Sequence, residues 1–364
     1  MSIIHWIGID DHADKWSIAC LRGEETKPSR EFEVVPNDAG YRRLVGWLKE
    51  LSTPRVVYEA GPCGYELFRR LNAAAIPCHV AAPSLTPLKP GDRVKTNRRD
   101  AIKLARYLRS GDLTLITVPD PQREALRDLI RGRDAVRKDL LSAQHQLTKL
   151  LLRHGHRYRD GRAWTTRFWD WVRKIQLPNA DSQIVLDEAI LTLGQRQNQL
   201  DRFDTHIEDA ARRPEYAPYV AALSVLRGIR TLSAMTLLAE LGDLRRFASA
   251  PQLMAAVGVV PSEYSTGDKT HRFSITKAGN AHVRRVVIEA AWHYQRRIIN
   301  GRKITDRRKG KPQALVDIAQ RCDLRLHRKF NRMTSRGKRS TVAAVACARE
   351  LIGFIWAIGQ TVHP

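Results

Sequence analysis

Cysteine is scarce in this chain, with 5 residues among 364. The five are widely scattered, form no CxxC pair and have no spacing typical of zinc ligands. This distribution argues against a disulfide-rich secreted domain and against a cysteine-based zinc module, and it predicts reduced thiols. The five are Cys20, Cys63, Cys78, Cys322 and Cys347.

Targeting and membrane-spanning segments are also missing. The first residues, Met1–His5, have neither the basic region nor the apolar core of a signal peptide. No apolar run approaches the length needed to cross a bilayer, and no lipidation signal or amphipathic anchor stands out. With 364 residues, 43% of them hydrophobic, the chain can form two or three globular domains with cores of their own. We therefore expect a cytoplasmic protein with no membrane partner.

Acidic residues are few relative to basic ones. Asp and Glu total 38 against 62 Lys and Arg, which gives a formal net charge of +24. Between His271 and Arg339 there are 20 basic and 4 acidic residues, a net of +16, so this short region carries most of the excess. The charge favours a polyanion such as a nucleic acid as partner, because phosphate contacts release counterions and supply affinity.

The run from Ile3 to Asp10 contains β-branched and aromatic residues and ends in acid, which predicts a buried strand. A carboxylate at the end of a central strand is held by rigid backbone and stays open to a cleft, as a metal-dependent nuclease requires. Because successive side chains of a strand point to opposite faces, only one of Asp10 and Asp11 can enter such a site, and we choose Asp10. The alternative is that both acids end the strand in a solvated turn.

Alternating elements follow this strand. Three strands and then a succession of helices and strands predict a mixed sheet with helices on its faces. One of these strands again ends in acid, at Glu59. The expected strands cover residues 15–21, 31–35, 55–59 and 78–81, and the expected helices cover 37–51 and 64–74.

A proline-rich connector at 83–90 leads through a basic loop into a helix that ends near Leu108. Asp100 falls in the first turn of this helix, where it could serve as a third acid of a metal site. Helix capping is the alternative: Asn97 as the cap with Asp100 three residues later resembles a capping arrangement, and acid suits the helix dipole there.

Residues 119–212 are expected to be helical and elongated. Two amphipathic stretches flank a break at 155–178, which predicts an antiparallel coiled coil or a protruding helical arm. The break holds a cluster of aromatic residues, for which packing at the tip or a subunit contact is favoured over a platform for base stacking. These aromatic residues are Trp164, Phe168, Trp169 and Trp171.

The remaining chain is expected to be mostly helical. The segment Leu226–Ala234 has a glycine turn between two short helices, as in a helix-hairpin-helix, whose turn can offer backbone N–H groups to a phosphate; an ordinary helix pair explains it equally well. Residues 301–312 are basic and expected to be mobile. A final apolar helix, 342–358, should pack back on the body.

A polar turn region at 258–269 carries two adjacent hydroxyls, Ser265 and Thr266, directly before Gly267. Basic residues flank these hydroxyls, so the region could present a nucleophile to a phosphodiester. The alternative is an ordinary hydroxyl-rich turn.

The separated acids fit the layout of RNase H-like nucleases, in which carboxylates from distant elements converge on Mg²⁺. The chain resembles the DEDD transposases of the insertion-sequence 110 family, relatives of the Piv invertase, and in particular their 1111 subgroup. The residues that carry the resemblance occur in the family's order over roughly residues 4–295. They are Gly8–Asp10, Tyr58–Ala60, Lys95–Ala101, Pro261–Gly267 and Ile275–Asn280.

The resemblance implies an RNase H/RuvC-like domain at 1–118, a helical coiled-coil arm at 119–212 and a mostly helical C-terminal transposase domain at 213–364. It implies an enzyme that cuts and joins DNA with Mg²⁺ and a covalent hydroxyl intermediate. In several members an element-encoded RNA guides the choice of DNA, and the assembly is a tetramer. We therefore expect a homo-oligomer, a dimer or a tetramer.

Carried onto this sequence, the family pattern implies three metal-binding and catalytic acids, Asp10, Glu59 and Asp100. The fourth acid position falls on Asn97, which can bind Mg²⁺ through its carbonyl oxygen but lacks the charge. The nucleophile position falls on Thr266, with Ser265 as the alternative. Basic residues near these motifs and in the basic segment are expected to contact phosphates: Lys95, Arg98, Arg99, Lys269, Arg272, Lys277, Arg284, Arg285, Arg307, Arg308 and Lys309.

Two other classes stay open at this point. A RuvC-like nuclease would only hydrolyse DNA, and it needs neither the helical arm nor the Ser265–Gly267 region. A catalytically inactive nucleic-acid-binding protein is favoured by Asn97, whereas three intact acids speak against it.

Overall fold

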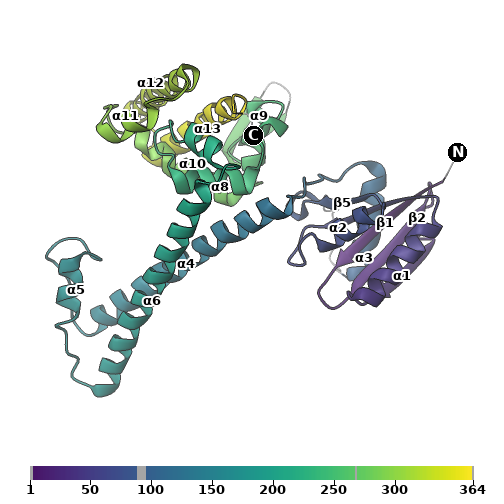
Figure 1. Ribbon diagram of the computed structural model, residues 1–364, viewed down its shortest axis with the longest axis horizontal. Helices are drawn as coiled ribbons and strands as arrows, with labels where there is room; N and C mark the ends of the chain where they lie inside the picture. Colours follow the sequence, from purple (N-terminus) through teal and green to yellow (C-terminus); the bar gives the residue numbers. More distant parts are fainter. Residues whose placement is uncertain (1–2, 88–95, 267–268, 363–364) are drawn as a thin grey trace. The chain divides into compact units, whose positions relative to one another are not determined.

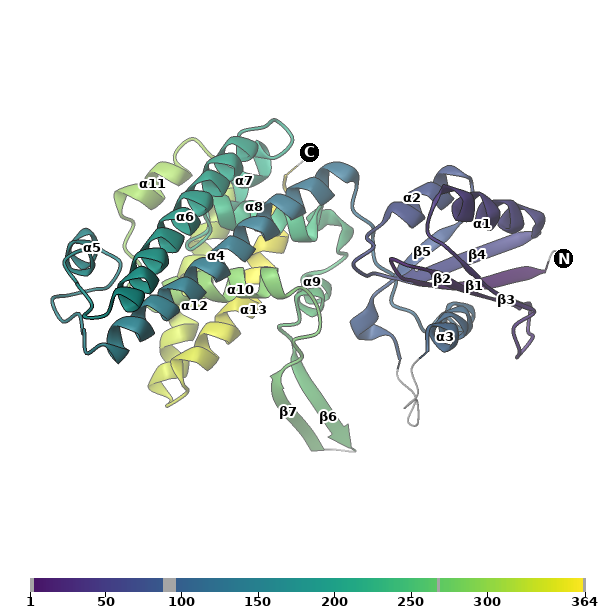
Figure 2. The ribbon, with the colours of Figure 1, turned by 90° about the horizontal axis from the view of Figure 1, so that it is seen from below.

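The computed structural model describes residues 3–87, 96–266 and 269–362. The chain divides into two compact units, an N-terminal unit, Met1–Pro119, and a C-terminal unit, Asp120–Pro364 (Figures 1 and 2).

The N-terminal unit is built on a mixed five-stranded sheet in the order β3-β2-β1-β4-β5. The first three strands form antiparallel pairs, whereas β1 pairs in parallel with β4, and β4 with β5. The mixed sheet predicted from the sequence is confirmed, and each predicted strand lies within a few residues of an observed one. The strands are β1 (Ile4–Asp11), β2 (Trp16–Arg22), β3 (Arg30–Val34), β4 (Thr53–Glu59) and β5 (Cys78–Ala81).

Helices cover both faces of this sheet. Figure 2 shows α1 (Asp38–Glu50) and α2 (Glu66–Ala73) on one face and α3 (Asn97–Ser110) on the other. The larger core lies under α1 and α2, where Ile7, Ile9 and Tyr58 are fully buried. Alternation along the strands gives this pattern, because every second side chain enters the same face.

Helix α3 approaches the sheet unusually closely at Gly8. A β-carbon placed on Gly8 would collide with the carbonyl oxygen of Ala101 and would lie 2.7 Å from the backbone nitrogen of Ala105. A glycine on β1 and two alanines on α3 therefore let the two backbones touch. This contact fixes the start of α3 against the last residues of β1.

The C-terminal unit begins with two long helices joined by a short one. Asp120 caps α4, since its side chain accepts a hydrogen bond from the backbone N–H of Arg123 (2.8 Å), and Pro121 follows in the first helical position. α4 and α6 pack along each other, with α5 at one end of the pair (Figure 1). The three helices are α4 (Pro121–Arg153), α5 (Thr166–Val172) and α6 (Ala180–Ala211).

The predicted aromatic cluster lies at that same end of the helix pair. Phe168 is buried, and the ring of Trp164 lies 4.9 Å from it, centroid to centroid. Trp169 and Trp171 contact the same ring. Mutual packing of the rings fits the interpretation as a packed tip better than a platform for base stacking.

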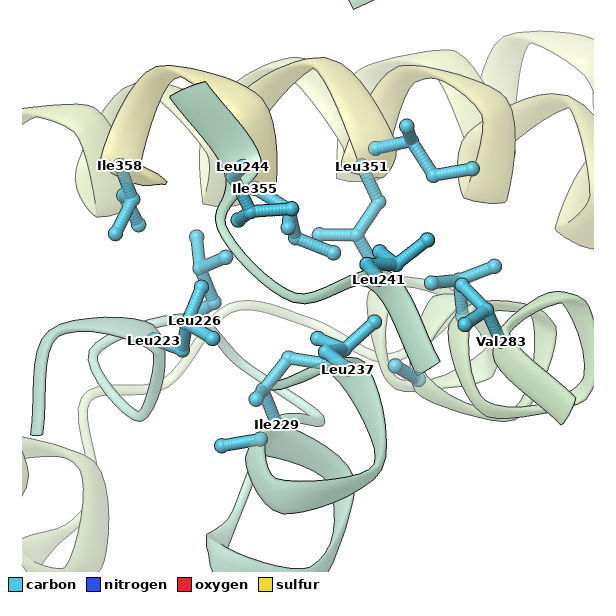
Figure 3. Packing of buried hydrophobic residues seen from close by; sticks show 14 of the residues in the cluster. Leu223, Leu226, Ile229, Leu237, Leu241, Leu244, Val283, Leu351, Ile355 and Ile358 are labelled. Carbon is cyan, nitrogen blue, oxygen red and sulfur yellow. The ribbon is translucent and has the colours of Figure 1, made fainter. Parts of the chain in front are cut away.

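The remaining helices, apart from α11, bury one common core. Figure 3 shows side chains of α8, α10 and α13 meeting there, among them Leu237, Val283 and Ile355. The helices are α7 (Ala217–Leu223), α8 (Thr231–Leu241), α9 (Ala250–Val257), α10 (Ala281–Ala291), α11 (Arg302–Arg308), α12 (Gln313–Ser335) and α13 (Ser340–Gly359).

The helix α13 contradicts the prediction that the chain has no apolar run long enough to cross a membrane. Ser340–Gly359 is, among the described residues, long and apolar enough to cross a membrane, although no such run was expected from the sequence. Half of its apolar window is buried, and Ala344, Leu351 and Ile355 lie in the core of the unit. The buried side of the helix packs into the core of its unit, as is typical of a core helix, while Arg349 and Glu350 lie on its other side.

The polar region at 258–269, expected to be a turn, belongs to a β-hairpin instead. β6 (Pro261–Thr266) and β7 (Lys269–Ile275) pair antiparallel, and Figure 2 shows the hairpin extending away from the helices of its unit. Two of its large side chains are exposed, Tyr264 at 67% and Phe273 at 63%. None of the hairpin side chains whose burial is described is fully buried, and the sequence lacks the apolar alternation that predicts a strand.

Residues 301–312 were expected to be mobile, but they contain helix α11. Ile304 and Arg308 are buried and anchor it to the body. The glycine turn before α8 also packs inward: a β-carbon on Gly228 would lie 2.6 Å from the carbonyl oxygen of Ala290 on α10. This close approach gives the glycine a packing role and fits an ordinary helix pair.

Candidate functional site

Asp10 and Glu59 end two neighbouring strands of the N-terminal unit. β1 and β4 run parallel, and Ile9 pairs with Tyr58, so the next residue on each strand is one of these acids. Gly8 and Val57, which precede the acids by two residues, lie on the face covered by α3. Side chains two residues apart share a face, so both acids belong to the α3 face of the sheet edge.

Asp11 belongs to the opposite face. Its Oδ1 accepts a hydrogen bond from Nε1 of Trp16 (2.7 Å), which lies in the core under α1 and α2. Burial raises the pKa of Asp11 above its ordinary value, although the hydrogen bond from Trp16 acts against the rise. The adjacent acid therefore has a structural partner of its own, as expected when only Asp10 faces the site.

Asp100 lies near the same end of β1. It directly precedes Ala101, whose backbone touches Gly8. The cap of α3 is Thr96, whose hydroxyl accepts a hydrogen bond from the N–H of Arg99 (3.3 Å), so the expectation of Asn97 as the cap is wrong. Asn97 is the first helical residue, and Asp100 follows three residues later on the same side of the helix. The capping arrangement of Asn97 with Asp100 is therefore not formed, whereas Asp100 still lies in the first turn, where an acid suits the helix dipole.

The acids share an edge but do not form a compact cluster. No group of three or more His, Cys, Asp or Glu side chains within the described ranges is close enough to hold a metal ion. One Oε of Glu59 accepts a hydrogen bond from the hydroxyl of Thr86 (2.7 Å), and Oδ2 of Asp10 lies 3.9 Å from Nε2 of His12.

The donor set nevertheless has the chemistry of a magnesium site. Carboxylate and amide oxygens are the hard ligands that Mg²⁺ takes, and Mg²⁺ is commonly held by only one or two protein carboxylates. Asp10, Glu59, Asp100 and Asn97 supply oxygen ligands alone, from strand ends and the first turn of a helix.

Arg98 has a partner that the sequence did not reveal. Its guanidinium binds the carboxylate of Glu31 on β3 through two hydrogen bonds. These bonds hold the pKa of Glu31 below its ordinary value. Arg98 thus ties the start of α3 to the far strand of the sheet, while Arg99 is exposed and Lys95 lies outside the described residues.

Ser265 and Thr266 are the last two residues of β6. Their backbones pair with Thr270 and Lys269 of β7. The candidate nucleophiles therefore lie at the end of β6, directly before residues 267–268, which lie outside the described residues. Of the basic residues expected nearby, the side chains of Lys269 and Arg272 lie outside the description, and Lys277 follows the hairpin with an exposed side chain.

The base of the hairpin is fixed by close backbone contacts. Gly258 and Gly279 have positive φ angles of 71° and 120°, and a β-carbon on either would collide with backbone oxygen of the opposing segment. Asn280 then caps α10, since its side chain accepts a hydrogen bond from the N–H of Val283 (3.0 Å). The Ile275–Asn280 motif thus anchors the hairpin to the helical body.

A buried carboxylate under this motif was not anticipated from the sequence. The side chain of Glu240 on α8 is fully buried, and it accepts hydrogen bonds from Arg131 of α4 (2.8 and 3.0 Å) and from Asn280 (2.6 Å). Burial alone would raise the pKa of Glu240, but these bonds and the charge of Arg127 outweigh it and lower the pKa. The only signal in the sequence is an acid near the end of the otherwise apolar helix Thr231–Leu241.

Several arginines expected to contact phosphates are engaged within the chain. Arg308 is buried and binds Asp323 (2.8 Å), so its assignment to the nucleic-acid surface is wrong in this structure. Arg307 donates to the carbonyl of Ile229, and burial lowers its pKa. Arg284 donates to the carbonyl oxygen of Val257 (2.9 Å), Arg285 pairs with Asp134 (3.1 Å), and Lys309 is exposed.

Two family models match separate parts of the chain. Residues 7–155 match a model of DEDD transposases of the IS110 type, and residues 220–305 match one described as the transposase IS116/IS110/IS902 family. The first match contains Asp10, Glu59 and Asp100, and the second contains the hairpin.

Relatives match over nearly the whole length. The protein y4qE of Sinorhizobium fredii, provisionally named a transposase, is 40% identical over 98% of this chain and 88% of its own length. The transposase for insertion sequence element IS1533 of Leptospira borgpetersenii is 30% identical, with 92% of this chain and 98% of that protein covered. The transposase for IS1111A of Coxiella burnetii is 23% identical, with 87% and 80% covered.

Proposed function

The chain belongs to the IS116/IS110/IS902 family of transposases, enzymes that cut and join DNA, and on that premise we propose how its residues act. The N-terminal unit binds Mg²⁺ with Asp10, Glu59 and Asp100. The hairpin of the C-terminal unit supplies a hydroxyl nucleophile, Thr266 or Ser265. The observation that carries the proposal is the register that sets Asp10 beside Glu59 on the α3 face.

The acids and Asn97 would hold the metal through oxygen atoms, and Mg²⁺ would supply charge stabilisation for phosphoryl transfer. Asp10 and Glu59 are positioned by strand ends, and Asp100 by the contact of α3 with Gly8. Asn97 contributes a neutral oxygen, so it orients the site without adding negative charge.

The hydroxyl conserves the energy of the phosphodiester bond. Its oxygen bonds to phosphorus, and the bond from phosphorus to the deoxyribose oxygen breaks, with the proton passing to the departing oxygen. A second strand's hydroxyl then attacks the same phosphorus and releases the protein hydroxyl. We favour Thr266 from its place directly before Gly267 and keep Ser265 as the alternative.

The partners follow from the same proposal. DNA is the substrate, an element-encoded RNA is a candidate guide, and the active assembly is a homo-oligomer, a dimer or a tetramer, in the cytoplasm.

The α4/α6 pair would form the coiled-coil arm at 119–212, between a catalytic domain at 1–118 and a transposase domain at 213–364. The division of the chain at Pro119 and Asp120 supports the first of these boundaries.

One observation favours a second candidate. Asn97 replaces an acid, and within the described ranges no three ligating side chains are gathered. A catalytically inactive nucleic-acid-binding protein would explain both. A RuvC-like nuclease that only hydrolyses is the remaining alternative.

Strand joining on supercoiled DNA that carries the element's ends separates the three functions. With Mg²⁺, joined products support the transposase, nicks alone support a nuclease, and binding alone supports an inactive protein.

Asp10→Ala should abolish joining while DNA binding and the fold are retained. Asp11→Asn is the matched control, because this neighbour faces Trp16 instead of the site and should retain joining. Equal loss in both variants would contradict the assignment.

A further inference from the structure

Much of the positive charge in the basic segment is used by the fold. Arg285 and Arg308 pair with buried carboxylates, and Arg307 is bound to a backbone carbonyl. The chain nevertheless carries a net charge of +24, so cations without a structural role must lie elsewhere on its surface. One helix of the C-terminal unit presents several of them together.

That helix is α12, which carries a stripe of basic side chains on its exposed side. Arg321, Arg325, Arg328 and Arg332 follow at intervals of four, three and four residues, the spacing that keeps side chains on one face of a helix. The stripe rises by about 16 Å along the axis. The opposite face of the helix is buried through Leu326, Phe330 and other apolar residues, so packing fixes the direction of the stripe.

The stripe forms one wall of a groove between α12 and α13, which lie side by side (Figure 2). The groove has a volume of about 770 Å³. Five cations and one carboxylate line it, a net of +4, together with Leu324 and Phe354. The cations are the four arginines of the stripe and Lys329, and the carboxylate is that of Glu350.

Glu350 orders part of the groove without neutralising it. Its two carboxylate oxygens accept hydrogen bonds from Arg325 and Lys329, each at 2.6 Å. Burial alone would raise the pKa of Glu350, but the two cations lower it. Arg321, Arg328 and Arg332 are exposed, and the described part of the chain gives none of them a carboxylate partner.

We propose that the groove between α12 and α13 binds the phosphate backbone of duplex DNA, independently of base sequence. Charge complementarity argues for a polyanion, and DNA is the polyanion on which this family acts. Along the length of the stripe, duplex DNA presents about ten phosphates, enough for every unpaired arginine. No Asn or Gln side chain that could read adenine lines the groove, so its polar contacts with DNA would come from Arg and Lys, the side chains that bind phosphates, and Phe354 is partly buried.

The test measures affinity of the full chain for a duplex of arbitrary sequence across salt concentrations, without divalent metal, so that no chemistry is needed. Replacing Arg321, Arg328 and Arg332 together with Ala should weaken binding and flatten the slope of log affinity against log salt by about 2.7 units. The corresponding triple Lys variant should restore most of the slope, because it restores the charge.

A matched control removes equal charge from another exposed part of the same unit. Arg157, Arg159 and Arg162 are exposed, and their joint replacement by Ala should change the slope much less. An unchanged slope in the α12 variant, an equal change in both variants, or a loss confined to structured RNA would overturn the proposal. This assay measures binding without cleavage, so a negative result would not contradict the proposed cutting and joining chemistry. Equally, a protein without joining activity could still bind DNA through this groove.

Discussion

At the scale of single residues, glycines and buried charges decide where the functional side chains can lie. Gly8 brings α3 against β1 and so sets Asp100 near Asp10. Arg98 reinforces that placement through Glu31. Because the contact at Gly8 is between backbones, no rotamer change can relieve a substitution there.

Gly8→Ala should therefore destabilise the N-terminal unit by roughly 3 kcal/mol and reduce strand joining even where the protein stays folded. Urea denaturation and the joining assay would measure both effects. Gly46→Ala is the matched control: Gly46 lies in α1 with nothing within 4 Å of an added β-carbon, so this change should stabilise by about 0.5–1 kcal/mol. Equal behaviour of the two variants would show that the contact with α3 is unimportant.

Arg308, the last residue of α11, and Lys309, which follows it, allow a buried charge to be compared with an exposed one. Arg308→Ala should cost roughly 3 kcal/mol of unfolding free energy, because Asp323 would be left buried with one of its cations removed. Lys309→Ala, at the exposed next position, should change stability by less than about 0.5 kcal/mol. Thermal unfolding of the two variants compares them directly. Similar melting temperatures would contradict the structural ion pair of Arg308 with Asp323.

At the scale of elements, the C-terminal unit fixes its hairpin through the helices beneath it. Glu240 joins α8, α4 and the cap of α10, so three elements meet on one carboxylate. Asn280, which ends the hairpin's anchoring segment, is bound from both sides. Among the hairpin side chains whose burial is described, none is fully buried, so the position of the hairpin depends on this base.

Glu240→Gln should destabilise the C-terminal unit by roughly 3 kcal/mol at neutral pH, because Arg127 and Arg131 lose a buried counter-charge. The folded-state pKa of Glu240 lies below its unfolded value of about 4.5, so its contribution is complete above that pH and is lost as pH falls through the folded value. The difference between variant and wild type in urea denaturation should thus shrink on acidification below pH 4.5. A difference that stays constant with pH would contradict the ionised network.

Elements were predictable from the sequence where their apolar residues are buried. β1 and β4 each contain three consecutive buried residues followed by an acid, and α1 is capped by Asn37, the first residue of the helix expected at 37–51, so the sheet and its helices could be located. The β6–β7 hairpin and α11 could not. The described side chains of the hairpin are exposed or half-buried, and α11 is a basic segment whose order depends on contacts with distant residues such as Asp323.

The sequence predicted which acids lie at one edge of the sheet, but not the contacts that hold them there. Acids at two strand ends and at a helix start indicated Asp10, Glu59 and Asp100, and the register is consistent with that choice. Thr96 and Asn97 are adjacent and both are favoured cap residues, so only the local geometry decides that Thr96 is the cap. The partner of Arg98 lies on a strand 67 residues away and has no signal in the sequence. Glu240 was missed for the same reason, because its partners lie 40 and 109 residues away.

At the scale of the whole molecule, a transposase has to hold DNA, cut it and rejoin it. We assign these tasks to the basic groove on α12, to the acids at the sheet edge and to the hydroxyls at the end of β6. The account's central claim is that joining proceeds through a covalent bond between the hairpin and DNA, since strand exchange without an external energy source needs the phosphodiester energy to be kept.

Trapping protein–DNA adducts on a suicide substrate tests this claim most directly. The substrate releases a fragment after the first cut, so a covalent intermediate accumulates and can be counted on a denaturing gel. Wild-type protein with Mg²⁺ should form the adduct, Thr266→Ala should lose it, and Ser265→Ala should keep it. Loss in Ser265→Ala alone would instead name Ser265 as the nucleophile. Adducts that form undiminished when both residues are replaced would contradict the hydroxyl mechanism for this protein.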